Sequence, residues 1–225
     1  MTKEERNRQL QKKLVEMKEF DQKTAGRDIL YVAGVDEVGR GPLAGPVVAA
    51  AVVLPKDFST PGIDDSKKLS EKKRIELDVE IRREALAIGI GMADNRKIDE
   101  INILEATKLA MREALFQADK SLFESAGEHL QHVIFDAVTL KDLDYPQTAV
   151  IKGDSKSLCV AAASIVAKVF RDSMMTEYAE KYPDYAFEKN KGYGTKAHYE
   201  GIKTAGICPI HRRSFLKNII AGKEQ

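Results

Sequence analysis

Two adjacent carboxylates, Asp36 and Glu37, stand at the end of an apolar stretch and directly before a glycine-rich segment. Carboxylates beside an apolar strand are costly unless a cation binds them. The next residues, 39–45, contain three glycines and a single arginine, and glycine lets backbone N–H groups come close to a polar ligand. This combination predicts a metal ion together with a phosphate-bearing substrate.

The spacing of the glycines excludes two familiar phosphate-binding loops. Dinucleotide-binding loops read G-x-G-x-x-G and open a helix, whereas this one reads Gly39-x-Gly41-x-x-x-Gly45 and leads after Pro46 into β-branched residues. No Gly-Lys-Ser/Thr follows, so the segment is not a Walker loop either. A tight hairpin with acids in its turn remains the alternative. Turn chemistry explains the glycines but not paired acids beside an arginine.

Further carboxylates are predicted beside other elements. Asp136 follows the apolar run 132–135, and Asp154 lies shortly before a long predicted helix. If the strand ends lie side by side, these two residues meet Asp36 and Glu37 at one edge of a sheet, and such oxygen ligands favour Mg²⁺ or Mn²⁺ over Zn²⁺. Two such ions can activate a water and stabilise the leaving oxygen in phosphodiester hydrolysis. Two alternatives stay open: Asp154 as a helix N-cap and Asp136 as a turn residue.

Asp36 and Glu37 are direct neighbours, and the first strand is predicted to end just before them, at Val35. On a regular strand, direct neighbours point to opposite faces of the sheet. We therefore expect a distorted backbone if both carboxylates are to share a metal, and the nearby Gly39 and Gly41 would permit one.

A second glycine-rich segment, residues 190–198, places Tyr193 between two glycines with lysines on either side. A ring presented in this way can stack on a sugar or base, and the lysines can bind phosphates as point charges. Thr195 can donate its hydroxyl to a phosphate or cap the helix that follows. The alternative is a flexible loop that contains an incidental aromatic residue.

The composition is that of a globular protein. The chain has 225 residues, 43% of them hydrophobic, which permits one large domain or one domain with an appendage. No apolar run approaches the ~18 residues of a membrane helix, and the N-terminus has no signal-like run, so we expect a cytoplasmic protein without membrane association. The two cysteines, Cys159 and Cys208, form no C-x-x-C pattern and fit a reducing compartment.

Basic residues are concentrated at the C-terminal end. The net charge of the whole chain is +1, but residues 189–225 hold eight Lys or Arg against two Glu, a charge of +6, which leaves −5 on the remainder. A basic end on a nearly neutral chain indicates a face that binds a polyanion, and a merely solvated tail is the alternative.

Hydrophobic periodicity predicts the elements that position these residues. Short loops join the first strands, which should be antiparallel, and helices join the later ones, so we expect an α/β fold with a mixed five-stranded sheet flanked by helices. Residues 1–28 are predicted as a helical N-terminal extension, and residues 29–225 as the main domain, with a basic helical part from about 189. The predicted strands are 31–35, 47–54, 87–93, 132–135 and 148–151. The predicted helices are 70–86, 98–120, 158–182 and 196–204. The first of these helices is expected to have Ile75, Val79, Arg82 and Leu86 on its inner face, and the second to place Ile101, Leu104, Leu109, Met111 and Leu115 in the core.

Several segments occur in an order that is far more specific than any one of them. Together they resemble the ribonuclease HII family over roughly residues 31–215. Val38 stands where that family usually has alanine, and we expect this difference to leave the chemistry unchanged. The segments are 34–46 (GVDEVGRGPLAGP), 65–69 (DSKKL), 101–107 (INILEAT), 152–157 (KGDSKS), 161–172 (AAASIVAKVFRD), 191–198 (KGYGTKAH) and 209–212 (PIHR).

The resemblance implies a ribonuclease H-like fold with a C-terminal helical extension. It also implies that Mg²⁺ or Mn²⁺, two ions in the active complex, is held by four catalytic carboxylates. In the family, a Gly-Arg-Gly loop recognises the ribose 2′-hydroxyl, which separates RNA from DNA, and a tyrosine stacks on the deoxyribose just 3′ of the ribonucleotide. The implied metal ligands are Asp36, Glu37, Asp136 and Asp154, and the implied substrate-binding residues are Gly39, Arg40, Gly41, Lys67, Tyr193 and Thr195.

The reaction implied by the resemblance is endonucleolytic hydrolysis on the 5′ side of a ribonucleotide, which leaves 3′-hydroxyl and 5′-phosphate ends. RNA–DNA hybrids and single ribonucleotides embedded in duplex DNA would both be substrates. Two alternatives remain, a non-catalytic protein that binds nucleic acid and a different nuclease on the same fold. No sequence pattern demands an oligomer, and we expect a monomer.

Overall fold

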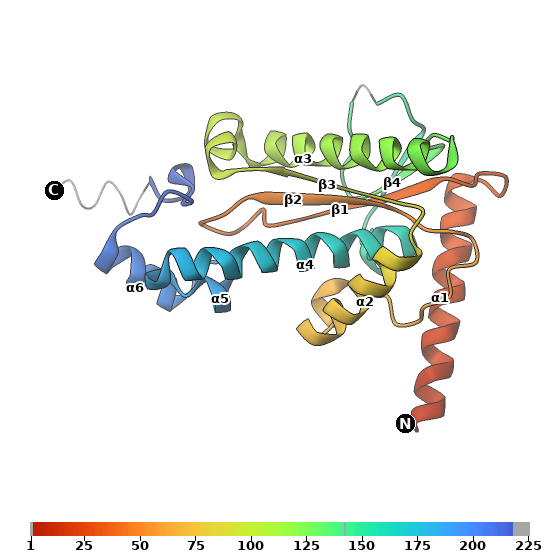
Figure 1. Ribbon diagram of the computed structural model, residues 1–225, viewed down its shortest axis with the longest axis horizontal. Coiled ribbons are helices and arrows are strands. Elements are labelled where there is room, and N and C mark those ends of the chain that lie inside the picture. The colour runs from red at the N-terminus through yellow and green to blue at the C-terminus, as the bar shows by residue number, and fades with distance from the viewer. Residues whose placement is uncertain (1, 142, 218–225) are drawn as a thin grey trace.

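The fold is described from a computed structural model, which describes residues 2–141 and 143–217 (Figure 1). Its single five-stranded sheet has the order β3-β2-β1-β4-β5. The first three strands pair antiparallel, while β4 runs parallel to β1 and β5 parallel to β4, so the predicted mixed sheet is confirmed. The strands are β1 (Val32–Val38), β2 (Val47–Val53), β3 (Ala87–Ala93), β4 (His132–Asp136) and β5 (Gln147–Val150).

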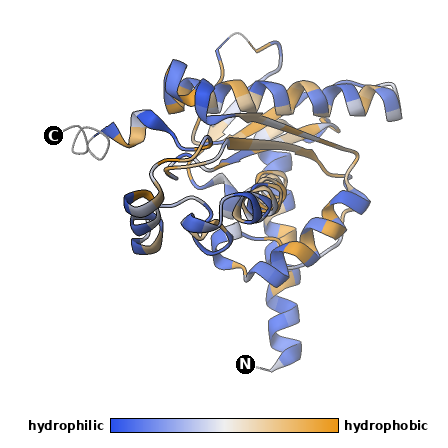
Figure 2. Cartoon of the chain, turned by 60° about the vertical axis from the view of Figure 1, so that its left-hand side comes forward, coloured by the Kyte–Doolittle hydropathy of each residue, from blue (hydrophilic) through white to orange (hydrophobic). Residues whose placement is uncertain are grey.

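Helices cover both faces of this sheet. Figure 1 shows α3 along one face, and α4 with α2 on the other, while α1 crosses one end of the sheet. Hydrophobic residues line the strands and the inner sides of the helices, and hydrophilic residues cover the outside (Figure 2). The helices are α1 (Lys3–Ala25), α2 (Glu71–Glu84), α3 (Asn95–Ala126), α4 (Leu158–Lys181), α5 (Phe187–Asn190) and α6 (Lys196–Ala205).

Glycines in the strands let the two long helices lie directly on the sheet. A Cβ on Gly89 of β3 would stand 1.9 Å from the carbonyl oxygen of Ala114 in α3. A Cβ on Gly34 of β1 would stand 2.1 Å from the carbonyl carbon of Cys159 in α4. Side chains at these positions would therefore push the helices away, since heavy atoms do not approach so closely.

Helix α3 is longer than predicted and contains a break. It begins after Asp94, whose side chain accepts from the backbone N–H of Lys97. Asn102 has a φ of 68°, outside helical geometry, and its side-chain oxygen accepts from the N–H groups of Leu104 and Glu105. Leu104 and Leu109 were predicted in the core but are exposed, because the side of α3 on which they lie faces away from the sheet.

The predicted inner face of α2 is wrong. Ile75 and Val79 are 50% and 57% exposed, and Leu86 lies beyond the end of the helix. The buried residues are instead Leu77 and Ile81, which are one turn apart and belong to the core between α2 and α4. Ser70 caps the helix, because its hydroxyl accepts from the N–H of Lys73.

Helix α1 is fastened to the rest of the fold along one side. Leu14 and Met17 are buried in the same core as α4. Lys18 Nζ donates to the carbonyl of Phe58 at 2.6 Å, and Asp21 Oδ2 accepts from the N–H of Cys159 in the first turn of α4 at 3.1 Å. Whether residues 1–28 form a unit of their own stays a prediction.

In length or composition, each helix of the described residues falls short of what a membrane span needs. Among residues 2–141 and 143–217, no helix has both the length and the apolar composition that crossing a bilayer requires.

Candidate active site

Asp36 and Glu37 lie inside β1 rather than beyond its end. Both take part in the regular antiparallel register with β2, in which Asp36 pairs with Ala50 and Glu37 with Ala49. The prediction that the strand ends before these residues is therefore wrong, because pairing with β2 continues to Val38. The register is regular, without the distortion expected if both carboxylates are to share a metal. The two carboxylates start from opposite faces of the sheet, since alternate residues of a strand do so.

Asp36 is buried on the face that α4 covers. Its carboxylate is hydrogen-bonded to Ser164 of α4 and also accepts from the N–H of Glu37 at 2.8 Å. The Ser164 hydroxyl lies 2.9 Å from that of Ser66, in the short 3₁₀ helix η1 (Ser66–Lys68). A buried polar contact thus joins β1, α4 and the loop that carries Lys67.

Asp136 ends β4 as predicted and lies beside Asp36. The parallel register pairs Val35 with Phe135, which places the next residue of each strand at neighbouring positions. Asp136 Oδ1 accepts from the backbone N–H of Gly153 at 2.8 Å. This bond holds the turn that leads to the fourth carboxylate, so Asp136 is more than a residue that ends a strand.

Asp154 lies in the 3₁₀ helix η2 (Gly153–Ser155) and is buried. The alternative that it caps α4 is wrong, since Ser157 caps that helix by accepting from the N–H of Val160. Asp154 Oδ2 is 3.7 Å from Nζ of Lys67, whose side chain is 81% exposed. The ammonium of Lys67 therefore lies beside a carboxylate and is also accessible to a ligand.

Burial and like charges raise the pKa values of Asp36, Glu37 and Asp154. Burial raises the pKa of Asp36 to about 8, and the neighbouring charges of Glu37 and Asp136 add to the effect. Burial also raises the pKa of Glu37, although Arg40, whose guanidinium lies 3.3 Å from Glu37 Oε1, opposes it. Burial, followed by the charges of Asp65 and Asp136, raises the pKa of Asp154.

The donor set fits a hard divalent cation. The four carboxylates offer oxygen ligands; the charge of Asp136 acts on both Asp36 and Asp154. Oε2 of Glu37 is buried without any hydrogen-bond partner. Among the described residues, however, no three Asp, Glu, His or Cys side chains already surround one point where a metal ion could sit. The backbone brings Asp36, Glu37, Asp136 and Asp154 together, and the side chains must still turn to complete a coordination shell.

Two buried arginines shape the glycine-rich loop between β1 and β2. The guanidinium of Arg212 donates to the carbonyls of Gly39, Arg40 and Gly45 at 2.6, 2.9 and 3.0 Å. That of Arg171, on α4, donates to the carbonyls of Pro46, Lys191 and Ala44 at 2.9, 2.9 and 3.1 Å. Both arginines are 0% exposed, and no carboxylate in the described part of the chain forms a salt bridge with either of them.

The direction of these bonds leaves the outer side of the loop free to donate. The carbonyls of Gly39 and Arg40 are turned inward to Arg212, while Arg40 and Gly41 are exposed. Within the described residues, the backbone N–H groups of Arg40 and Gly41 have no hydrogen-bond partner. Gly39 has a φ of +90°, and a Cβ there would stand 2.2 Å from Nε of Arg171, so only glycine fits.

The segment with Tyr193 packs against this loop. Leu43 N donates to the carbonyl of Gly192 at 2.8 Å, and a Cβ on Gly41 would lie 3.6 Å from Cε1 of the Tyr193 ring. The ring itself is 44% exposed. Thr195 caps α6, because its hydroxyl oxygen accepts from the N–H of His198 at 3.3 Å, which leaves the hydroxyl proton free to donate.

The structure thus gathers most of the predicted site around the end of β1. The two arginines that support the loop had no role in the sequence interpretation, although both lie in segments that carry the family resemblance. Their signal was weak, because a single arginine near an apolar helix or a loop is normally a surface residue. Nothing in the sequence indicates that Arg171 and Arg212 bind carbonyls far away along the chain.

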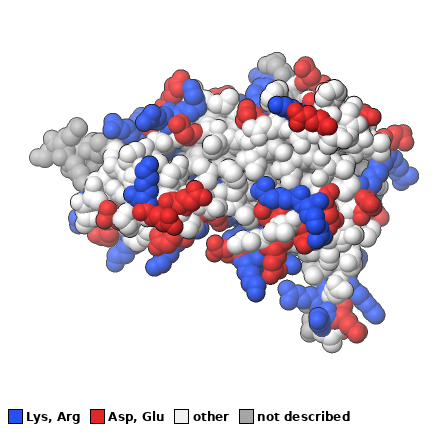
Figure 3. Space-filling view, viewed as in Figure 1, with Lys and Arg blue, Asp and Glu red and all other residues white. Residues whose placement is uncertain are grey.

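The basic C-terminal part is less concentrated in space than in sequence. Residues 189–217 hold seven Lys or Arg and one Glu, but Arg212 is fully buried among carbonyls. Figure 3 shows separate basic side chains at this end of the molecule, with acidic ones between them on the face in view. A continuous basic surface is therefore not present on that face.

Comparison with known proteins identifies the family. The family model described as ribonuclease HII matches residues 33–218. The chain is 50% identical to the ribonuclease HII of Caldanaerobacter subterraneus subsp. tengcongensis over 94% of this chain and 84% of that one, and 54% identical to that of Listeria monocytogenes serotype 4b over 94% and 77%.

Among solved structures, the ribonuclease H2 of Pyrococcus horikoshii OT3 is similar with a TM-score of 0.63 and 27% identity, over 82% of this chain and 93% of that one. This likeness agrees with the mixed five-stranded sheet and its helices. Family model, sequence relatives and fold all agree: the chain belongs to the ribonuclease HII family and is a ribonuclease H, an endonuclease that acts on nucleic acid.

Proposed function

We propose that this ribonuclease H hydrolyses the phosphodiester on the 5′ side of ribonucleotides, both in RNA–DNA hybrids and where one ribonucleotide is embedded in duplex DNA. The products would carry 3′-hydroxyl and 5′-phosphate ends. The observation that carries the proposal is that four carboxylates, two of them buried and two partly buried, lie beside a loop with free backbone N–H groups. The carboxylates are those of Asp36, Glu37, Asp136 and Asp154.

These four carboxylates would hold two divalent ions, Mg²⁺ or Mn²⁺. When bound, the ions would supply an activated water and stabilise the leaving oxygen of the phosphodiester. The raised pKa values of Asp36 and Asp154 support this role, because carboxylates that repel one another and lack water gain from a cation. The unpartnered Oε2 of Glu37 offers a further ligand atom.

Recognition of the ribose would come from the loop backbone. A 2′-hydroxyl can accept from the free N–H groups of Arg40 and Gly41, and deoxyribose has nothing to place there. This contact needs no side chain, which agrees with glycine on both sides of Arg40. The carbonyls that Arg212 holds inward keep acceptor atoms away from the ligand.

The flanking residues would position the strand. Lys67 offers an exposed ammonium beside Asp154, where it can bind a phosphate oxygen as a point charge. The half-exposed ring of Tyr193 beside Gly41 can stack on the sugar next to the ribonucleotide. Thr195 can donate its hydroxyl to a phosphate at the start of α6.

The test is cleavage of an end-labelled DNA duplex with a single ribonucleotide, in Mg²⁺, in Mn²⁺ and in chelator. We expect metal-dependent cutting on the 5′ side of the ribonucleotide, while an all-DNA duplex stays intact. An RNA–DNA hybrid in a parallel reaction reports the second substrate. Cutting of the all-DNA duplex, or cutting that persists in chelator, would contradict the proposal.

A further inference from the structure

A buried row of hydrogen bonds runs beneath Tyr193 and uses two histidines outside the carboxylate site. His198 of α6 and His211 of the C-terminal segment are almost fully buried. Nδ1 of His198 lies 2.9 Å from the carbonyl oxygen of Tyr193, and Nε2 of His198 lies 2.9 Å from Nε2 of His211. Nδ1 of His211 in turn lies 2.9 Å from the backbone nitrogen of Cys208.

The two ends of this row determine where each proton lies. A carbonyl only accepts, so Nδ1 of His198 must carry the proton that it donates to Tyr193. A backbone N–H only donates, so Nδ1 of His211 must accept from Cys208. Nε2 of His198 is therefore unprotonated and accepts the proton that Nε2 of His211 donates. In all three bonds the donor is on the side of Cys208 and the acceptor on the side of Tyr193.

The competing contact of His211 is the weaker one. Its Nδ1 also lies 3.3 Å from the carbonyl of Cys208, and a proton on Nδ1 would point there. That arrangement would set the amide of Cys208, at 2.9 Å, against another donor and would deprive His198 of its partner. The Sγ atom of Cys208, 3.1 Å from Nδ1, fits the accepting form because a thiol can donate to it.

The surroundings keep both imidazoles neutral. Burial lowers the pKa of His198, and burial together with His198 lowers the pKa of His211 to about 4. The rings of Tyr185 and Phe187 pack around the pair, with centroids 4.9 Å from His211 and 5.2 Å from His198 respectively. A third proton on the pair would place two donors face to face between two buried rings.

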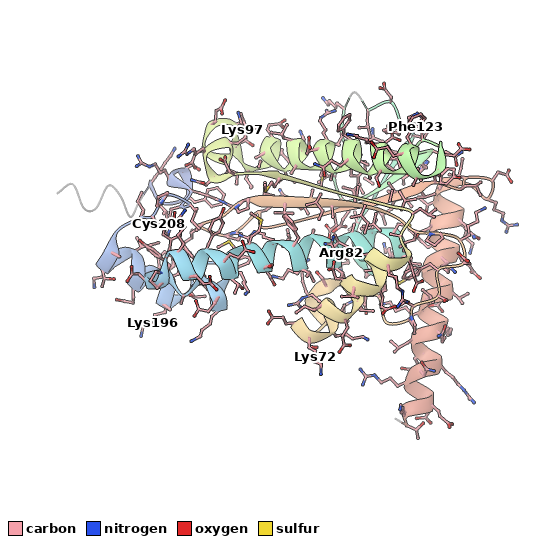
Figure 4. All side chains as sticks on the ribbon, viewed as in Figure 1. Lys72, Arg82, Lys97, Phe123, Lys196 and Cys208 are labelled. Atoms are coloured by element: carbon pink, nitrogen blue, oxygen red, sulfur yellow. The ribbon has the colours of Figure 1, made fainter. Side chains whose placement is uncertain are left out.

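The pair also joins the two loops of the site. His211 forms a bridge with Ala44, in the glycine-rich loop, and its neighbour Arg212 holds the same loop by its carbonyls. Figure 4 shows Cys208, whose N–H begins this row, at the end of the molecule where α6 lies, with Lys196 of α6 directed toward the outside. The row therefore ties the C-terminal segment to the backbone of Tyr193.

We propose that His198 and His211 are positioning residues that fix the backbone of Tyr193 and thereby set its ring over the sugar beside the ribonucleotide. The inference rests on the proposed role of Tyr193 in substrate binding and adds the residues that determine its placement. The histidines do not touch substrate. Their effect falls on discrimination at the ribonucleotide rather than on hydrolysis itself.

The first test uses no substrate. Long-range ¹⁵N–¹H NMR spectra of the full-length protein at neutral pH report which ring nitrogen of each histidine carries the proton. We expect the Nδ1–H form for His198 and the Nε2–H form for His211. The Nε2–H form on His198, or a charged ring on either residue, would overturn the proposal whatever the enzyme cleaves.

The second test compares kcat/KM for a duplex with one ribonucleotide and for a long RNA–DNA hybrid. His198→Phe keeps a ring but removes the donor to Tyr193, and we expect the ratio of the two values to fall ~10-fold, about as in Tyr193→Ala. His198→Asn, whose amide nitrogen replaces Nδ1, should restore most of the ratio. The double variant Tyr193→Ala/His198→Phe should lose no more than Tyr193→Ala alone, because one effect acts through the other.

Controls separate this inference from a general loss of fold and from the proposed function. His129→Asn changes an exposed histidine on the far side of the sheet and should leave the ratio unchanged. If His198→Phe does not fold, His211→Gln, whose amide can still donate to His198, should retain the ratio. Equal losses on both substrates, or additive losses in the double variant, would contradict the positioning role. Wild-type protein that cleaves neither substrate would contradict the proposed function and leave the NMR result standing.

Discussion

The two halves of the site are built in opposite ways. Around Asp36, carboxylates are buried next to one another, their pKa values are raised, and Oε2 of Glu37 has no partner. Around Arg171 and Arg212, every guanidinium nitrogen donates to a loop carbonyl, and the two histidines complete a directed row of bonds. The carboxylate half thus keeps a polar atom without a partner, whereas the hydrogen bonds of the arginine and histidine half are complete.

This difference indicates how the work is divided. A finished hydrogen-bond network holds its geometry before the substrate arrives, which suits recognition of a sugar. An incomplete group of carboxylates is destabilising until a cation joins it, which suits a reaction that depends on added ions. Changes in the first half should therefore affect activity and spare or even improve stability, whereas changes in the second half should affect both.

The largest effect is expected from Asp36→Asn. The amide cannot replace an anionic ligand, so we expect cleavage of the single-ribonucleotide duplex to fall by ~10³-fold or more. Thermal unfolding in chelator at neutral pH should show a variant at least as stable as the wild type, because folding of the wild type must protonate Asp36 or bury its charge, and the neutral amide needs neither. A variant that keeps its activity, or that unfolds several degrees earlier, would break the contrast between the two halves.

Arg212→Met should be the opposite case. Three buried carbonyls lose their donor, at ~1–3 kcal/mol for each group left unsatisfied, so we expect the free energy of unfolding to fall by ~3 kcal/mol or more. Arg212→Lys keeps the charge but not the planar fork, and should lie between Met and wild type. Urea denaturation measures both, with the exposed neighbour Arg213→Met as the matched control that should remain close to wild type.

The pH dependence of stability sharpens the contrast further. The pKa of Asp36 rises from 3.8 in the unfolded chain to about 8 in the folded protein, so its protonated form favours folding below pH 4 and this contribution is lost as the pH rises toward 8. In chelator, the difference in Tm between Asp36→Asn and wild type should grow between pH 5 and pH 8, by ~2–4 °C for each kcal/mol. A constant difference across this range would mean that folding does not raise the pKa of Asp36.

The smallest effect is expected from Lys67→Ala. Its side chain is largely exposed and its contact with Asp154 spans 3.7 Å, so stability should change by less than ~1 kcal/mol. The value of kcat/KM should fall ~10-fold at low salt and by less at high salt, because a phosphate contact is screened by counterions. Lys68→Ala removes a neighbouring lysine that pairs with Asp64 instead and should have no such salt-dependent effect.

Sequence patterns predicted the sheet and long helices well, because strand runs such as 47–54 and 87–93 are dense and bounded by clear turn residues. The patterns failed where the packing of two elements against each other determines a strand end or a buried helix face. The end of β1 depends on pairing with β2, which carries the strand through Asp36 and Glu37. The inner face of α2 depends on its position on α4, which buries Leu77 and leaves Ile75 exposed.

The candidate site divides in the same way. The acidic and glycine-rich residues could be selected from the sequence, because their types alone indicate metal and phosphate chemistry. Arg171 and Arg212 could not, because their roles consist of bonds to backbone carbonyls up to 173 residues away. The histidine pair could not either, because its role depends on bonds to the backbone of Tyr193 and Cys208 and on the contact between the two rings. Every residue type has a backbone carbonyl, so the types of the accepting residues do not reveal these bonds.

The contact between Asp21 and the first turn of α4 has a consequence for how the chain is made. Asp21 leaves the ribosome early, but the N–H of Cys159 that it accepts from is synthesised 138 residues later. During translation α1 can therefore dock on α4 only after most of the chain has been made. A contact across such a long loop forms late in folding. Exchange of Asp21 should therefore leave the refolding rate almost unchanged and mainly speed unfolding, because a contact that forms late is absent from the folding transition state. Molecules in the native state should cleave at the normal rate.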